Sequence, residues 1–182
     1  MEFLVACSYF ILPACAANVV PVLAKRFNIF PSLALPMDCG VKVGGEPLLG
    51  SHKTLRGFVL GTMAAVIVTM GQNILDRFTP LSVPELVDYA QANWLVLGFL
   101  LGFGSLIGDA MGSFVKRRAR KKPGKPFPVL DQVGMAIMAI IMVMGVYPLS
   151  MDAIVAIIVL TFFWHMGASR TAYLFGIRQE KW

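Results

Sequence analysis

The sequence predicts an all-α integral membrane protein, a polytopic bundle of about five transmembrane helices formed by a single domain over residues 1–182. Hydrophobic residues make up 57% of the chain and charged residues only 14%, which is too apolar for a water-soluble domain of this size. A membrane span takes roughly 20 apolar residues and tolerates about 17. Five stretches of sufficient length carry no Asp, Glu, Lys or Arg: 3–24, 57–75, 89–108, 132–151 and 153–169.

These stretches predict transmembrane helices at about 3–24, 57–75, 89–115, 131–151 and 153–176. The third helix is extended past Asp109 because residues 110–115 are apolar again. The alternative for the first stretch is a cleaved signal peptide, but Glu2 stands where such a peptide carries positive charge. The cysteines form no C-x-x-C pair, so neither a zinc site nor a disulfide framework is expected.

The distribution of basic residues predicts the orientation of the bundle. With five spans, 15 of the 16 Lys and Arg residues fall on one side and only Arg77 on the other. Basic loops stay in the cytoplasm, so we expect the N-terminus outside, the C-terminus inside and cytoplasmic segments at 25–56 and 116–130. The net charge of +6 is then a property of the cytoplasmic face. It suits anionic lipid headgroups or polyphosphates, and no nucleic acid polymer is expected as a partner.

The first cytoplasmic segment, 25–56, is rich in Gly and Pro and is not expected to form a regular helix. It ends in Gly50-Ser-His-Lys53-Thr54-Leu-Arg56-Gly57, directly before the second predicted helix. Glycine, hydroxyls and cations before a helix N-terminus are typical of phosphate binding, because free N–H groups and the helix dipole attract the anion. The alternative is a helix cap with cations at the membrane surface. The spacing does not fit a P-loop, and no strand precedes it.

The second segment begins inside the third predicted helix, where Asp109 interrupts an apolar run. A carboxylate at such depth is costly, so it should face the bundle interior, a water-filled cavity or a bound cation. Asp109, Ser113 and Lys116 follow at helical spacing and share one face. Small residues flank that face and leave room for a ligand or another helix: Gly102, Gly104, Ser105, Gly108 and Gly112.

A cationic loop follows, and Asp131 stands at the start of the fourth predicted helix. The simplest interpretation of the loop is an anchor on lipid headgroups. That interpretation does not account for the two acids that bracket it. Asp109 and Asp131 can together bind Mg²⁺, while the cations hold a polyphosphate bridged to that metal. Asn18, in the first predicted helix, is either a ligand contact or an interhelical hydrogen bond.

The run from Ser113 to Arg117, preceded by Gly108-Asp109 and followed by Pro128-Val-Leu-Asp131-Gln132, resembles the signature of CDP-diacylglycerol synthases. The whole chain is more similar to the archaeal CDP-archaeol synthase family. The similarity rests on these blocks: Asn18 with Pro21; Gly50, Lys53, Thr54, Arg56 and Gly57; Asp109 and Lys116; Asp131 and Gln132. The H-G-G element of the larger bacterial enzymes is missing, and Gly134 stands where their acidic motif has a second Asp.

The resemblance implies that CTP and 2,3-bis-O-geranylgeranylglycerol 1-phosphate, an isoprenoid ether lipid phosphate, give CDP-archaeol and pyrophosphate at a site facing the cytoplasm. Asp109, Lys116 and Asp131 are expected to act around one triphosphate, with both acids as Mg²⁺ ligands. The other nucleotide- and phosphate-binding positions are expected to be Asn18, Gly50, Lys53, Thr54, Arg56, Ser113, Arg117 and Gln132.

Two other functions stay open on the residues alone. One is another membrane transferase acting on lipid phosphates, although the D-G-x-x-A-R pattern of the CDP-alcohol phosphotransferases is absent. The other is a small transporter or channel that uses Asp109 as an intramembrane ion site, with the basic loop as an anchor only.

Overall fold

The structure is a computed structural model that describes residues 1–79, 84–120 and 130–174. It contains five α-helices: α1 Glu2–Arg26, α2 Leu55–Phe78, α3 Trp94–Arg118, α4 Leu130–Met144 and α5 Met151–Leu174. Between α1 and α2 lie a short 3₁₀ helix, Pro31–Leu33, and a hairpin of two strands, β1 Lys42–Val43 and β2 Glu46–Pro47. The predicted all-helical class is confirmed, with this small hairpin added.

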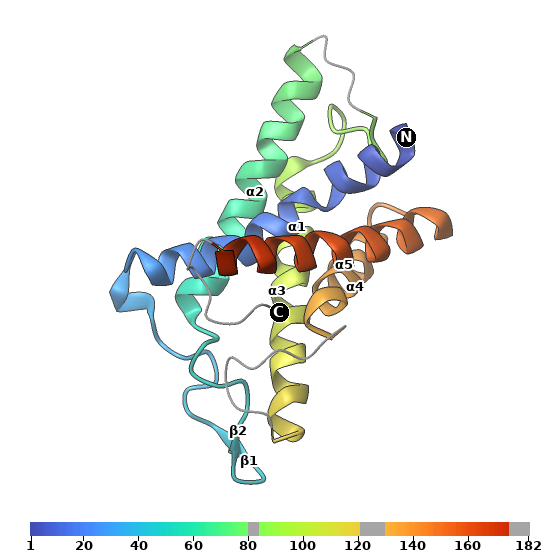
Figure 1. The fold of residues 1–182 in the computed structure, drawn as a ribbon. Coiled ribbons are helices and arrows are strands. Elements are labelled where there is room, and N and C mark those ends of the chain that lie inside the picture. The colour runs from blue at the N-terminus through green and yellow to red at the C-terminus, as the bar shows by residue number, and fades with distance from the viewer. Residues whose placement is uncertain (80–83, 121–129, 175–182) are drawn as a thin grey trace.

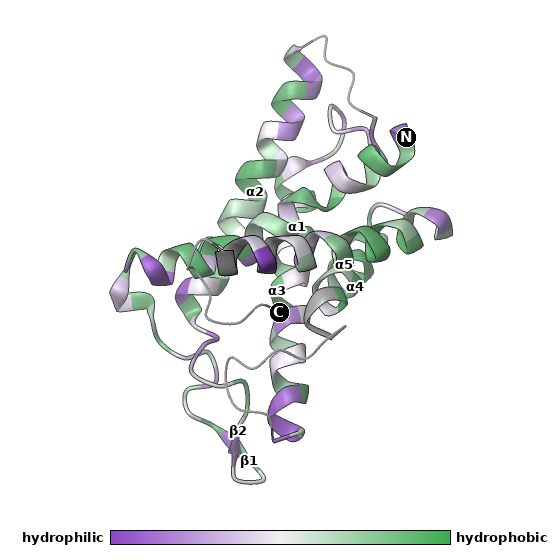
Figure 2. Ribbon diagram, viewed as in Figure 1, coloured by the Kyte–Doolittle hydropathy of each residue, from purple (hydrophilic) through white to green (hydrophobic). Residues whose placement is uncertain are grey.

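Helix α3 runs through the middle of the bundle and contacts α1, α2 and α4 (Figure 1). Its C-terminal end reaches the hairpin, whereas its N-terminal end lies beside the connection from α2 (Figure 1). We call the first of these the hairpin end and the second the opposite end. Hydrophilic residues gather toward the two ends, and the middle of the bundle is mostly hydrophobic (Figure 2).

Three of the helices, α1, α2 and α3, are long and apolar enough to cross a membrane. Within the described residues, α4 and α5 contribute shorter apolar stretches, Val133–Met144 and Met151–Gly167. Large apolar side chains are exposed along the bundle, for example Ile67 on α2 and Val155 on α5. Such a surface is stable against lipid chains and would be unfavourable in water.

The helix boundaries differ from those expected from charge alone. Helix α3 begins at Trp94, five residues later than predicted, because Asn93 caps it by accepting hydrogen bonds from the amides of Leu95 and Val96. It continues to Arg118, since basic side chains in a last turn interact favourably with the helix dipole. Helix α4 ends at Met144, seven residues before the predicted end.

Close contacts between helices depend on glycine. A Cβ on Gly108 of α3 would lie 2.2 Å from the carbonyl oxygen of Gly134 on α4, and one on Gly102 would lie 2.5 Å from Cβ of Ala65 on α2. Neither position has room for a side chain. The absence of side chains therefore lets α3 approach both neighbours, as is common between helices in membranes.

Candidate active site

Basic side chains from three elements gather at the hairpin end around His52. They come from the end of α1, the loop before α2 and the last turn of α3: Lys25, Lys53, Lys116 and Arg117. Partial burial lowers the pKa of His52, and the positive charges of these four residues lower it further. His52 is therefore largely neutral at pH 7, and the surrounding potential favours an anion.

Asp109 lies within this basic cluster. Its Oδ2 accepts a hydrogen bond from the Lys53 ammonium in an ion pair that links α3 to the loop before α2. The Asp109 side chain is 36% exposed and that of Lys53 is 19% exposed. The carboxylate thus has a cationic partner and access to solvent, which reduces the cost of placing it inside an apolar helix.

The loop that carries Lys53 is built around Asp38, which the sequence analysis did not single out. Its carboxylate is 7% exposed and accepts hydrogen bonds from the amides of Gly40, Leu49 and Gly50 at 2.9–3.1 Å. These bonds, that of Gly50 foremost, lower the pKa of Asp38 and keep it ionised. Gly50 has φ of +93°, a conformation that a residue with a side chain rarely adopts. The only sequence signal for this turn is Asp38 two residues before Gly40.

Arg117 lies directly beside Gly50. A Cβ built on Gly50 would be 4.0 Å from Cδ of Arg117, so the arginine side chain passes next to this loop. Arg117 is only 4% exposed, and its Nε has no hydrogen-bond partner among the described residues. Buried polar groups in proteins are almost always paired. A buried guanidinium with an unpaired Nε beside a glycine turn is therefore a candidate for binding an anion.

Several predicted site residues make structural hydrogen bonds. Thr54 caps α2 by accepting from the amide of Gly57 at 3.2 Å. Arg56 is buried and donates to the carbonyl of Ile29 at 3.0 Å. The Ser113 hydroxyl donates to the main-chain carbonyl of Asp109 at 3.1 Å. Each of these bonds joins a side chain to the main chain at the hairpin end.

Asn18 connects α1 to α3. Its amide donates to the carbonyl of Ala14 at 2.9 Å and to Oγ of Ser105 at 3.0 Å. Ser105 lies four residues before Asp109 and so on the same face of α3. Of the two interpretations of Asn18, the structure shows the interhelical hydrogen bond, located one helical turn from Asp109.

The side chains of Asp131 and Gln132 lie outside the described residues, as do residues 121–129. The backbone of α4 is described from Leu130, and the contact between Gly134 and Gly108 holds its second turn against α3 next to Asp109. Asp131 is three residues before Gly134, a distance of about 4.5 Å along a helix. The helix therefore brings the backbone of its first turn close to Asp109.

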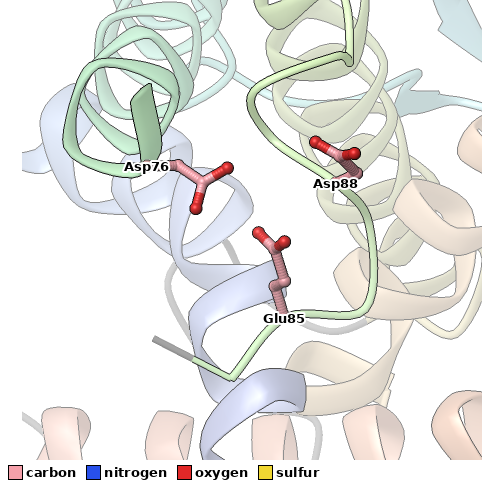
Figure 3. Close-up of side chains that lie close together, drawn as sticks. All are labelled: Asp76, Glu85 and Asp88. Atoms are coloured by element: carbon pink, nitrogen blue, oxygen red, sulfur yellow. The ribbon is translucent and has the colours of Figure 1, made fainter. Parts of the chain in front are cut away.

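Three carboxylates that sequence analysis missed lie together at the opposite end: Asp76, Glu85 and Asp88 (Figure 3). Each accepts a hydrogen bond from a main-chain amide of residues 89–91. Burial raises the pKa of Glu85, and the neighbouring acids Asp76 and Asp88 raise it further. These hydrogen bonds hold residues 89–91 in place before α3 begins. The three carboxylates lie at the N-terminal end of α3, and the basic cluster lies at its C-terminal end.

Comparisons with known proteins give the family. A model of CarS-like proteins, described as CDP-archaeol synthase, matches residues 1–182. The chain belongs to the CDP-archaeol synthase family. A CDP-archaeol synthase of Thermococcus kodakarensis is 38% identical over 175 residues, covering 96% of this chain and 94% of the relative. A CDP-archaeol synthase of Methanocaldococcus jannaschii is 33% identical over 184 residues, and the match covers 100% of this chain and 98% of the relative.

A solved structure described as an intramembrane enzyme for archaeal membrane lipid biosynthesis is similar in fold to this family member. It is 29% identical, with a TM-score of 0.64, and the match covers 88% of this chain and 90% of that chain. Together with the apolar helices, this likeness identifies the chain as a multi-pass membrane protein.

Proposed function

We propose that the protein transfers the CMP moiety of CTP to 2,3-bis-O-geranylgeranyl-sn-glycerol 1-phosphate, forming CDP-archaeol and pyrophosphate. A phosphate oxygen of the lipid attacks the α-phosphorus of CTP, and the bond from that phosphorus to the oxygen bridging to the β-phosphate breaks. The full-length match to CDP-archaeol synthases carries this proposal. The buried Arg117 beside Gly50, whose Nε has no partner among the described residues, supports it, because a triphosphate is an anion that such a group can bind.

The chemistry needs charge compensation more than proton transfer. The lipid phosphate is ionised at neutral pH, so no general base is required. Both substrates are anions, and their approach is opposed by like-charge repulsion. Lys53, Lys116 and Arg117 lower that repulsion and stabilise the charge that builds on the pyrophosphate leaving group. Catalysis in this scheme comes from position and electrostatics.

We infer that Mg²⁺ accompanies CTP and that Asp109 and Asp131 are its protein ligands. Magnesium is usually held by one or two carboxylates together with phosphate oxygens, and it neutralises charge on the phosphates. Asp109 fits this role because its carboxylate is partly exposed among phosphate-binding cations, and Lys53 contacts only Oδ2. The start of α4 beside Gly108 supports Asp131 as the second ligand.

The side of α3 that faces away from Asp109 offers an apolar surface to lipid chains. Met111 and Val115 lie on the last two turns of α3 and are 52% and 42% exposed, although both are apolar. We propose that the isoprenoid chains stay in the membrane against exposed apolar side chains of the bundle, while the lipid phosphate reaches Lys53 and Arg117. The lipid then enters from the side and its chains never leave the bilayer.

We also propose five spans with the N-terminus outside and the hairpin end in the cytoplasm. The gathering of basic residues at the hairpin end supports this orientation. Cytoplasmic CTP would then reach the site directly. Cys39, exposed in the loop at the hairpin end, can report it: in inverted vesicles with the cytoplasmic face outward, an impermeant maleimide should label Cys39. Labelling only in right-side-out cells would reverse the assignment.

The activity itself is tested with purified protein, CTP and the lipid phosphate. We expect pyrophosphate release that requires both substrates and a divalent cation. A protein that leaves CTP intact but consumes a CDP-lipid would instead belong with the phosphotransferases. The channel alternative has less support, because Asp109 is paired with Lys53 at one end of the bundle.

A further inference from the structure

Arg118, the last residue of α3, is bound to the β1–β2 hairpin. Its Nη1 donates to the carbonyl of Val43 at 2.6 Å, and its Nη2 donates to those of Glu46 and Pro47 at 3.2 and 2.8 Å. The guanidinium therefore bridges both strands. It also lies 5.1 Å from the ring centre of Phe114, one turn earlier on α3.

The hairpin itself is short. Gly44 and Gly45 both have positive φ, at +62° and +84°, as a two-residue turn requires. Lys42 and Val43 are exposed, and only two residue pairs form the ladder. An isolated two-stranded hairpin is marginally stable in water. Among the described residues, Arg118 supplies the side-chain hydrogen bonds that join the hairpin to α3.

A series of hydrogen bonds connects the hairpin to Gly50. Pro47 ends β2 three residues before Gly50, and the amide of Leu48 extends the ladder by donating to Val41 at 2.9 Å. Asp38 then binds the amides of Leu49 and Gly50. The loop from residue 38 to residue 50 is thus one hydrogen-bonded unit, with Arg118 at one side and Gly50 at the other.

Arg118 and Arg117 are adjacent on α3 but have different surroundings. Arg117 is buried and its side chain passes beside Gly50, whereas both terminal nitrogens of Arg118 donate to main-chain carbonyls of the hairpin. We propose that Arg118 is a positioning residue: it holds the hairpin on the end of α3 so that Gly50 and Lys53 stay beside Arg117 and Asp109. The inference rests on the proposed function, since it concerns the loop around Gly50 and Lys53 that is proposed to bind the CTP phosphates.

Two substitutions separate position from charge. Arg118→Gln removes both the charge and the planar fork of donors, and Arg118→Lys keeps the charge but cannot bridge three carbonyls. Arg120→Gln is the matched control, because Arg120 is an exposed cation two residues further on. Hydrogen exchange of residues 36–54 without CTP reports the hairpin, and the KM for CTP reports the site. Thermal unfolding of each variant checks that the bundle is intact.

Both Arg118 variants should exchange the amides of Leu48, Leu49 and Gly50 faster and raise the KM for CTP at least about tenfold, with a smaller change in kcat. Arg120→Gln should change either quantity by less than about twofold. If Arg118→Lys behaves as wild type, charge alone is sufficient and the inference is wrong. Faster exchange with an unchanged KM would also contradict it.

The outcome for the wild-type protein separates this inference from the proposed function. A wild-type protein that does not bind CTP would remove the proposed function and this inference with it. A wild-type protein that binds CTP, together with Arg118 variants that bind it equally well, would remove this inference alone.

Discussion

At the scale of single residues, Asp109 carries the most specific role. Asp109→Asn keeps the size of the side chain but removes the charge that holds Lys53 and, in our proposal, Mg²⁺. We expect turnover to fall by about 100-fold or more, as when one charge-stabilising group is lost, while the bundle stays folded. Pyrophosphate release measures this loss. Asp152→Asn, an exposed acid in the first turn of α5, is the control, and equal turnover in both variants would refute the metal assignment.

Arg117 gives a prediction in which stability and binding respond differently. Arg117 is buried and its Nε has no hydrogen-bond partner among the described residues, so without CTP Arg117→Met should leave the unfolding temperature unchanged or raise it. The same change should weaken CTP binding at least about tenfold, because a charged hydrogen bond to phosphate is lost. Thermal unfolding with and without CTP measures both effects. A large destabilisation of the empty protein would mean that Arg117 is a structural residue.

His52 reports the charge of the site. Burial and then four nearby cations lower its pKa, and a bound triphosphate offsets the cations, so CTP should raise the pKa of His52. A group whose pKa rises on binding takes up a proton when the ligand binds. CTP should therefore bind more tightly as the pH falls through the range between the pKa of His52 with CTP and its pKa without CTP. Histidine NMR titration measures the shift directly. His52→Gln removes this contribution from the pH dependence of CTP affinity, and an unchanged His52 pKa with CTP would place the nucleotide elsewhere.

At the scale of the elements, the contact between α3 and α4 holds the backbone of the first turn of α4 close to Asp109. Gly108→Ala would place a Cβ 2.2 Å from the Gly134 carbonyl, so the helices must separate. We expect a loss of about 1–3 kcal/mol in the free energy of unfolding and a marked loss of activity. Gly71→Ala on α2 is the control, because its Cβ would meet nothing within 4 Å. Equal behaviour of the two variants in unfolding and activity assays would contradict this role for the contact.

Some of these elements could be predicted from the sequence and others could not. The long uncharged runs predicted helices because span length depends on composition alone. The start of α3 was misplaced because 89–92 are uncharged, although Asn93 was a readable capping signal. The hairpin was missed because strands of two residues show no alternation. Its link to α3 joins residues more than 70 positions apart, which no local pattern encodes.

At the scale of the whole molecule, the sequence predicted which residue types the site needs but not how they pair. Lys53 and Asp109 were both expected near phosphate, yet their ion pair depends on how a loop folds back over α3. Asp38 was not expected because its function is to bind amides of its own loop. Arg56 and Ser113 stay predicted ligand contacts, and their hydrogen bonds to main-chain carbonyls were not foreseen. Such hydrogen bonds to main-chain amides and carbonyls depend on how the folded backbone places these groups.

The central claim is that CMP passes from CTP to a lipid phosphate at the hairpin end. The most direct measurement uses purified protein, the lipid phosphate and CTP labelled at either the α- or the γ-phosphate. We predict that the α label moves into the lipid extract and the γ label appears in pyrophosphate, in equal amounts, and that Asp109→Asn abolishes both. Label from the γ-phosphate in the lipid, or α label released as free CMP, would contradict the account.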